Sequence, residues 1–320
     1  MSRENIEILY WNAENIFHPE SGGPRGDQTF SSGWTLDKYN RKLDRVVELI
    51  GKSSKVNDFP PIIGISEVEN SKTSKDLLKR FPEQFKLVEA NSFDKYLDNI
   101  LIYNSEIFSL LYSKYHSVIK RSDKGDFLEC DLLHKKSDKI VTIYVCHFKS
   151  KYEGDEYTEA FRCVNCDHLQ QHLLEKHGKE SSPFIVVGDF NDDPFSKPMF
   201  QYLLSTYDFE FVKNQIVDDK IFLYNASFEK LLDKNPGTLY HRNKFGTPWM
   251  IFDQFIISPF MLNESSEVKY CEKSYSVVDN LSSTKDGEPD RCLRWNENGR
   301  YFSEGYSDHF PIKIEIEFKY

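Results

Sequence analysis

Short apolar runs that end in polar residues recur along the whole chain. The run from Ile6 to Trp11 leads into Asn12 and Glu14, and the run at 60–66 leads into Glu67. Similar runs, each typical of a β-strand, lie at 85–89, 99–103, 107–112, 127–133, 139–146, 184–188, 208–212, 250–257 and 310–318. Helical spacing appears at 38–50 and in a segment that begins at 158. The pattern predicts an α/β protein that is rich in sheet.

The stretch FIVVGDFNDDP, residues 184–194, combines a strand with a dense polar turn. Its apolar part is rich in β-branched residues and predicts a buried strand, and Gly188 opens a turn that carries Asp189 and Asn191. Two positions apart on an extended backbone, these two side chains are expected to point the same way. A carboxylate beside a carboxamide suits a divalent metal together with a phosphate oxygen. The alternative is an acidic turn that only caps a strand.

Five predicted strand boundaries carry such polar side chains, and a sheet edge could gather them into one site. These boundaries lie at Asn12, Glu67, His147, Asp189 and the pair Asp308 and His309. The wider candidate set contains oxygen donors and one imidazole but no thiolate: Asn12, Glu14, Glu67, Asp189, Asn191, Asp253, Asp308 and His309. Such a set prefers Mg²⁺ or Mn²⁺ and predicts metal-assisted hydrolysis of a phosphate ester.

Two histidines are candidates for catalysis. Asp253 lies in a predicted strand and offers a carboxylate that could orient His309 and raise its basicity. His147 precedes Lys149 and Lys151, so three potentially cationic groups would lie beside a bound phosphate. The alternatives are a structural hydrogen bond for His309 and a solvated basic loop for the segment after His147.

The segment after residue 158 carries cysteines and histidines whose spacing invites a zinc interpretation. On a helix, however, Cys163 and Cys166 lie on one side and His168 and His172 on nearly the opposite side, so these four residues cannot bind one ion. We expect core cysteines and surface histidines. Arg162 shares the cysteine side, and an inward guanidinium that faces phosphate is predicted.

Composition narrows the class of protein. The 320 residues are 39% hydrophobic and 15% aromatic, which is typical of a globular chain, and we expect a single domain over 1–320. A net charge of −10 argues against a protein that coats nucleic acid through a general basic field. Six cysteines in so long a chain predict reduced thiols, and with no signal peptide visible a cytoplasmic location is expected.

Six motifs follow one another in the order of a known superfamily. They are WNAEN (11–15), SEVEN (66–70), HFKSK (147–151), GDFNDDP (188–194), FDQFIIS (252–258) and YSDHFPI (306–312). Together they resemble the endonuclease/exonuclease/phosphatase superfamily, which includes deoxyribonucleases, apurinic endonucleases, sphingomyelinases and inositol polyphosphate phosphatases. The resemblance implies a four-layer αββα sandwich, in which two mainly antiparallel β-sheets pack face to face between helices.

The resemblance also implies how a metal is held. Glu67 would be the principal metal carboxylate, with help from Asn12 and Asp308. Glu14, where apurinic endonucleases carry an acid two residues after the asparagine, would be a second metal contact. The implied cofactor is Mg²⁺ or Mn²⁺.

The same resemblance assigns the catalytic roles. Asp189 and Asn191 would position the nucleophile and the transition-state phosphate, and Asp253 would pair with His309. His147 would contact phosphate or assist the leaving group. Members of the superfamily differ over whether the aspartate or the histidine acts as the base, and both assignments stay open here.

The substrate is the least determined feature. HFKSK and the run up to YSDHFP look most like bacterial nucleases of this group, which favours a phosphodiesterase that acts on nucleic acid, more specifically DNA. The alternatives are a phosphomonoesterase or lipid phosphodiesterase of the same fold and, third, an inactive binding module. The signature Pro-x-Trp-x-Asp-Arg of inositol polyphosphate phosphatases is broken here, because Pro248 and Trp249 are followed by Asp253 and Gln254. The loops at 18–34 and 279–305 are expected to set substrate choice.

Overall fold

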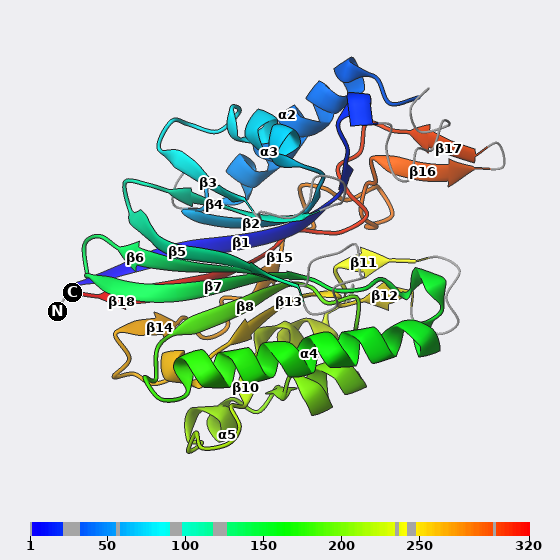
Figure 1. The fold of residues 1–320 in the computed structure, drawn as a ribbon. Coiled ribbons are helices and arrows are strands. Elements are labelled where there is room, and N and C mark those ends of the chain that lie inside the picture. Colours follow the sequence, from blue (N-terminus) through cyan, green and yellow to red (C-terminus); the bar gives the residue numbers. More distant parts are fainter. Residues whose placement is uncertain are drawn as a thin grey trace.

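Two β-sheets lie face to face, with helices on both outer faces (Figure 1). The structure is a computed structural model that describes residues 2–21, 33–55, 58–89, 98–117, 127–233, 237–241, 248–296 and 299–320. Residues 22–32 of the loop expected at 18–34 therefore lie outside the described residues.

The first sheet joins the beginning and the end of the chain. Its strands follow the order β14 (Val268–Tyr270), β18 (Ile312–Lys319), β1 (Arg3–Ile16), β2 (Ile62–Val68), β4 (Asp98–Asn104) and β3 (Phe85–Glu89), and β15 (Ser276–Val277) also pairs with β18. Only the β1/β2 pair is parallel among these neighbours. The sheet is therefore mixed but mainly antiparallel, as expected.

The second sheet contains the middle of the chain. Its order is β5 (Phe108–His116), β6 (Phe127–His134), β7 (Lys139–His147), β8 (Phe184–Asp189), β13 (Asp253–Ile257), β10 (Leu223–Asn225) and β9 (Ser205–Thr206). Among the described residues, two further two-stranded antiparallel sheets pair β11 (Leu239–Tyr240) with β12 (Trp249–Met250) and β16 (Leu293–Asn296) with β17 (Gly299–Phe302).

Helices cover both sheets. α2 (Leu36–Ser53) and α3 (Ser71–Leu78) lie over the first sheet, and α4 (Asp155–His177) and the short α5 (Phe209–Lys213) lie on the side of the second (Figure 1). Within the ranges that the structure describes, the remaining helical turns are η1 (Pro19–Ser21), η3 (Lys151–Glu153), η4 (Pro198–Tyr202), η5 (Ala226–Leu232) and η6 (Pro259–Met261).

Alternation along the strands explains the four layers. In β1, Ile8 and Tyr10 point into the apolar core between the sheets, whereas Leu9 and Trp11 point into the core beneath α2. A third apolar core lies between the second sheet and α4 and includes Cys166. Because successive side chains of a strand face opposite sides, strands that are apolar on both faces require a layer on each side. The predicted αββα sandwich is confirmed.

Two predicted strands differ from the structure. The segment at 208–212 is not a strand but the helix α5, because the Asp208 side chain accepts a hydrogen bond from the Phe211 N–H and so caps a helical turn. The single strand predicted at 250–257 is divided into β12 and β13. A hydrogen bond from the Ile251 N–H to the Asp193 carboxylate takes that backbone group away from the sheet.

All six cysteines are free thiols in this structure. On α4, Cys163 and Cys166 are buried, whereas His168 and His172 line a cavity on another side of the helix. Among the helices described here, none has the length and apolarity needed to cross a bilayer.

Candidate active site

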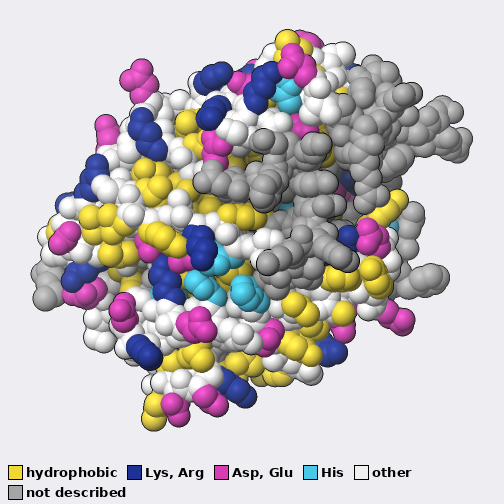
Figure 2. Space-filling model, in the orientation of Figure 1, with side chains coloured by type: hydrophobic (Ala, Val, Ile, Leu, Met, Phe, Trp, Pro, Cys, Tyr) yellow, Lys and Arg dark blue, Asp and Glu magenta, His cyan; other side chains and the backbone are white. Residues whose placement is uncertain are grey.

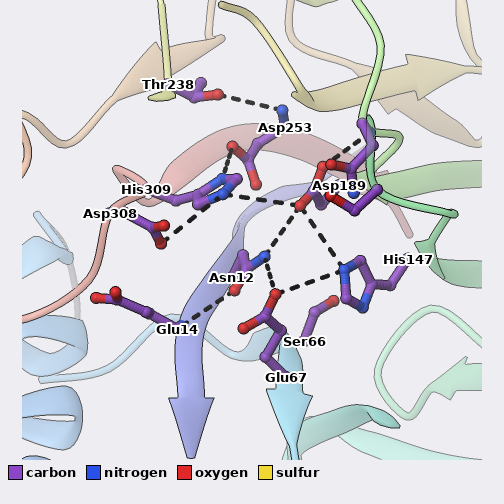
Figure 3. Close-up of polar contacts among 12 residues, drawn as sticks. Asn12, Glu14, Ser66, Glu67, His147, Asp189, Thr238, Asp253, Asp308 and His309 are labelled. Atoms are coloured by element: carbon purple, nitrogen blue, oxygen red, sulfur yellow. Dashed lines mark hydrogen bonds and ion pairs between the residues drawn. The ribbon is translucent and has the colours of Figure 1, made fainter. Parts of the chain in front are cut away.

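Strands of both sheets end at one edge, and their polar side chains meet there (Figure 3). In the second sheet, β7 runs parallel to β8 with His147 opposite Asp189, and β13 runs antiparallel to β8 with Asp253 opposite Asp189. In the first sheet, parallel β1 and β2 bring Asn12 and the end of β2 to the same edge. Residues far apart in the sequence thus become neighbours.

The Asn12 side chain connects the two sheets. Its Nδ2 donates to Glu67 Oε1 at 3.1 Å and to Asp189 Oδ2 at 2.9 Å. Its oxygen faces the other way and accepts the Glu14 N–H at 3.0 Å. The sequence assigned Asn12 to the metal, whereas in this arrangement its nitrogen, not its oxygen, faces the carboxylates. Asn12 here holds two carboxylates in place.

Glu67 reaches the site because the backbone of β2 is distorted. Its φ of 64° is left-handed, and the register with β4 shifts between Ile65 and Val68. The Asn15 N–H donates to Glu67 Oε2 at 2.7 Å, which fixes the carboxylate, while 17% of the side chain stays exposed. Glu14, Asn15 and Asn191 are also left-handed, so strained backbone is concentrated at this edge.

An imidazole lies between two carboxylates. His309 Nδ1 is 2.7 Å from Asp253 Oδ2, and its Nε2 is 3.8 Å from Asp189 Oδ2. Burial alone would lower the pKa of His309, but the charges of Asp253 and Asp189 raise that pKa well above its ordinary value. Burial raises the pKa of Asp189, and the positive charge of His309 offsets part of this increase. His309 is therefore held as an imidazolium that faces a buried carboxylate.

His147 lies on the other side of Asp189 from His309 (Figure 3). Its Nε2 is 3.6 Å from Glu67 Oε1 and 3.9 Å from Asp189 Oδ2. Asp189 is thus flanked by two imidazoles and one amide, and its side chain is only 2% exposed. This surrounding of donors is suited to stabilise negative charge on a bound phosphoryl group.

The similarity to known proteins follows the geometry. Residues 7–318 match the sequence profile of the Endonuclease/Exonuclease/phosphatase family. The chain belongs to this family. Its members are phosphoric ester hydrolases, and this chain is therefore a hydrolase of the same class. A comparison with curated protein sequences finds no match.

Solved structures of family proteins share the fold at low sequence identity. An endonuclease/exonuclease/phosphatase family protein from Bacteroides thetaiotaomicron is 16% identical with a TM-score of 0.63, covering 99% of each chain. A mannosyl-6-phosphatase from the same organism is 16% identical with a TM-score of 0.60, covering 97% of this chain and 99% of its own. TDP2 from D. rerio, complexed with a single-strand DNA product, is 13% identical with a TM-score of 0.57, and the match covers 98% of this chain and 99% of the TDP2 chain.

A buried polar network behind the site could not be found from the family motifs alone. The Asp189 N–H donates to the Tyr10 hydroxyl at 2.9 Å, and this hydroxyl lies 2.5 Å from Ser66 Oγ. Ser66 donates to Asn99 Oδ1 at 2.7 Å, and Asn99 donates to the Val145 carbonyl. The network ties β1, β2 and β4 to β7 and β8. It fixes the distance between the sheets at the point where the site forms.

Asn191 differs from the extended arrangement expected from the sequence. β8 ends at Asp189, and Asn191 is left-handed with a φ of 51°. The Asn191 N–H donates to Asp189 Oδ1 at 2.8 Å, and its Nδ2 donates to the Phe148 carbonyl at 3.1 Å. The turn therefore brings Asn191 to Asp189 by folding back, not by the two-residue alternation of a strand.

Arg291 is a site residue that the sequence did not reveal. Its guanidinium lies 2.8 Å from Glu14 Oε1 and 3.0 Å from Asp308 Oδ2. The other Glu14 oxygen accepts the N–H groups of Cys292 and Leu293. Burial raises the pKa of Glu14 to about 7. The charge of Asp308 also raises this pKa, whereas the charge of Arg291 lowers it. Both oxygens of Glu14 are engaged, so Glu14 does not present the free metal contact expected of it.

The predicted phosphate-facing role of Arg162 is wrong. The fully buried guanidinium donates to Asp192 at 2.5 Å, to Asp155 at 2.6 Å and to Thr158 at 2.8 Å. These bonds, with one to the Lys149 carbonyl, hold the loop after Asp189 against α4. Arg162 does lie on the same side of α4 as Cys163 and Cys166. However, Asp192 fills the space that its guanidinium faces.

Arg162→Met is expected to destabilise the protein by about 3 kcal/mol, because it leaves Asp192 buried with only part of its counter-charge. Urea unfolding measures the loss. The double variant Arg162→Met/Asp192→Asn should recover at least half of it, since the buried charge is gone as well. Equal stability of Arg162→Met and the unmodified protein would contradict the assignment.

The two lysines lie at the rim of the site. Lys151 Nζ is 2.7 Å from Asp192 Oδ1, and Lys149 Nζ is 3.0 Å from Glu153 Oε1. Both side chains remain partly exposed. Their positions are compatible with contacts to a substrate that extends beyond the cluster of site residues.

The residues present fit a divalent cation of the hard type. Glu67, Asp189 and Asp308 supply carboxylate oxygens at one edge, and a buried oxygen of Asp253 has no hydrogen-bond partner. Oxygen atoms of Asp189 and Asp253 and a nitrogen of His309 all lie within 4.8 Å of one another. Asp253 already hydrogen-bonds to Nδ1 of His309 at 2.7 Å, so these three residues are better suited to proton transfer than to metal binding. Glu67 is more exposed and is the better metal ligand.

Proposed function

We propose that the chain is a divalent-metal-dependent phosphodiesterase that hydrolyses nucleic acid, and DNA in particular. The observation that carries the hydrolytic part is the single cluster of side chains that unites Glu67, His147, Asp189, Asp253 and His309. A bound Mg²⁺ or Mn²⁺, held by Glu67 with Asp189 and Asp308 beside it, would neutralise charge on the phosphoryl oxygens.

The roles of the protein groups follow from their charges. Asp189 is the proposed base, because burial raises its pKa and makes it a better proton acceptor than an ordinary carboxylate. His309 is protonated and donates toward the phosphoryl oxygen, while Asp253 keeps it charged and oriented. His147 lies across from His309 and serves the leaving oxygen or a second phosphoryl oxygen.

The rim supports nucleic acid as the substrate. The segment after His147 carries Tyr152, which is 94% exposed, and the loop after Asn191 carries Phe195, which is 62% exposed. Lys151 Nζ, 2.7 Å from Asp192, brings these two segments together. Exposed aromatic rings beside lysines are the elements that bind unpaired bases and phosphates. The DNA-bound relative of the same fold is consistent with this proposal.

Tyr152→Ala and Phe195→Ala are each expected to raise KM for a single-stranded oligonucleotide about tenfold, because one stacked base contributes about 1–3 kcal/mol. Hydrolysis of a small aryl phosphodiester, which offers no base, should stay within about twofold. Tyr207→Ala, a ring beyond β9 that is 69% exposed and so comparable to Phe195, is the matched control. An unchanged KM in both variants would show that these rings do not bind the oligonucleotide, and the rim would then no longer support nucleic acid as the substrate.

Asp253→Asn is expected to lower kcat about 100-fold and to change its pH profile. The charge of Asp253 raises the pKa of His309, so without it His309 loses its proton at lower pH. The fall of the rate on the alkaline side should therefore move to lower pH. A reduced rate with an unshifted profile would show that Asp253 acts only through packing.

A substrate panel tests the proposed substrate class. The purified protein is incubated with plasmid DNA, single-stranded DNA, RNA, mannose phosphate, inositol phosphates and sphingomyelin, each with Mg²⁺ and with EDTA. DNA fragments that appear only with Mg²⁺ support the proposal. Intact nucleic acid together with release of inorganic phosphate from a sugar phosphate would favour the second candidate, a phosphomonoesterase, toward which the similarity to a mannosyl-6-phosphatase points.

A further inference from the structure

Three histidines and a glutamate gather on the opposite face of the second sheet, away from the candidate active site. His116 ends β5, Glu129 lies on β6, and His168 and His172 lie on α4. An open cavity of about 420 Å³ is lined by the three histidines together with Lys114, Tyr115, Ser117, Gln171 and Glu175. Figure 2 shows histidine side chains gathered on the face of the molecule that carries α4 in Figure 1.

The register places this cluster relative to the active site. His116 pairs with Phe127, and Phe127 pairs with Cys146, which directly precedes His147. Phe127 and Cys146 point into the core beneath α4, whereas His147 points to the other face of the sheet. The histidine cluster around His116 and the active-site residue His147 therefore lie near the same end of the sheet but on opposite faces.

The donor atoms converge on one point. His116 Nε2 is 2.6 Å from Glu129 Oε2, and His172 Nε2 is 3.0 Å from the same oxygen. All three atoms lie within 4.8 Å of one another. A tetrahedral Zn²⁺ has bonds of about 2.0–2.1 Å, which place its ligand atoms about 3.3 Å apart. The two contacts to Glu129 Oε2 need to lengthen by about 0.3 and 0.7 Å to reach this separation.

The surroundings fix the ligands in this arrangement. The His116 ring stacks on Phe127 at a centroid distance of 4.5 Å and an interplanar angle of 15°. Lys176 pairs with the other oxygen of Glu129 at 2.5 Å and with Asp131 at 2.7 Å, so Oε2 stays directed at the imidazoles. His168 precedes His172 by one helical turn and lines the same cavity, where it is available as a further nitrogen ligand.

We propose that His116, Glu129 and His172, with His168 beside them, form a binding site for Zn²⁺ that joins the edge strand β5 and its neighbour β6 to α4. Two or three imidazoles with one carboxylate select Zn²⁺ over Mg²⁺, which prefers oxygen ligands. The ion would stabilise the edge of the second sheet. The site is separate in chemistry and position from the hard-metal site of the proposed function.

Dialysis against Zn²⁺ and the visible absorption of bound Co²⁺ test the site. The full chain is expected to bind one equivalent with the intense absorption of tetrahedral Co²⁺, and millimolar Mg²⁺ should not displace it. His172→Ala and His116→Gln should each weaken Zn²⁺ binding at least tenfold. Gln171→Ala, on the same helix and in the same cavity, should keep the affinity within about twofold.

Glu67→Gln separates this site from the active site, because it removes the main carboxylate of the latter. It should retain the Co²⁺ spectrum and the rise in Tm that Zn²⁺ produces, whereas folded His116→Gln should lose both. The proposal is overturned by unchanged Zn²⁺ affinity in the two histidine variants, by a weak octahedral Co²⁺ spectrum, or by loss of tetrahedral binding in Glu67→Gln.

Discussion

Asp189→Asn is expected to reduce kcat for phosphodiester hydrolysis by about 10³-fold while the protein stays folded. The variant removes the proposed base and the negative charge that keeps His309 protonated. It also removes one of the two carboxylates to which Asn12 donates. Because a buried charge is lost, no large decrease in thermal stability is expected. Steady-state kinetics and circular dichroism on the same preparation measure both quantities.

Asp138→Asn is the matched control for that experiment. Asp138 is exposed and left-handed at a turn, a backbone conformation that asparagine accepts well. It should leave kcat within about twofold. A rate for Asp189→Asn within tenfold of the unmodified protein would exclude Asp189 as the base and leave His309 for that role.

Glu67→Gln is expected to lower activity about 10³-fold and to weaken Mn²⁺ binding at the candidate active site by at least tenfold. The amide keeps one oxygen to accept the Asn15 or Asn12 donors but carries no charge for a cation. Electron paramagnetic resonance of free Mn²⁺ measures the binding, and a higher Mg²⁺ concentration should restore part of the rate.

The control for Glu67→Gln is Glu69→Gln, a change two residues further along the same motif. Glu69 is buried and accepts the His18 N–H at 2.7 Å, a bond that the amide oxygen can also accept. Metal binding and activity should stay within about threefold. Unchanged Mn²⁺ affinity in Glu67→Gln would contradict its assignment as the main metal carboxylate.

Much of the fold and of the site could be predicted because apolar strands end in polar residues. Strands buried on both faces are short and rich in apolar, β-branched residues. Asn12, Glu67, His147 and Asp189 therefore stand out at the ends of such runs, and the structure brings them to one edge. The Asp253 and His309 pairing was also predicted and is present at 2.7 Å.

Other features depend on tertiary contacts that leave no local signal. Tyr10 looks like an ordinary core residue of β1, yet its hydroxyl holds the Asp189 backbone across the two sheets. Arg162 lies on the predicted side of α4, but its partner Asp192 comes from a loop thirty residues away. Arg291 contacts Glu14 only because the chain end returns beside β1. Sequence periodicity shows which way a side chain points, not which partner it meets.

The central claim is that strand ends of both sheets form one metal-dependent phosphoester hydrolase site. Its most direct test is the rate of bis(p-nitrophenyl) phosphate hydrolysis by the unmodified protein and Asp189→Asn, before EDTA, after EDTA and after return of Mg²⁺ or Mn²⁺. We predict a rate that EDTA abolishes and the metal restores in the unmodified protein, with almost none in the variant. An equal rate in EDTA, or full activity in the variant, would contradict the claim.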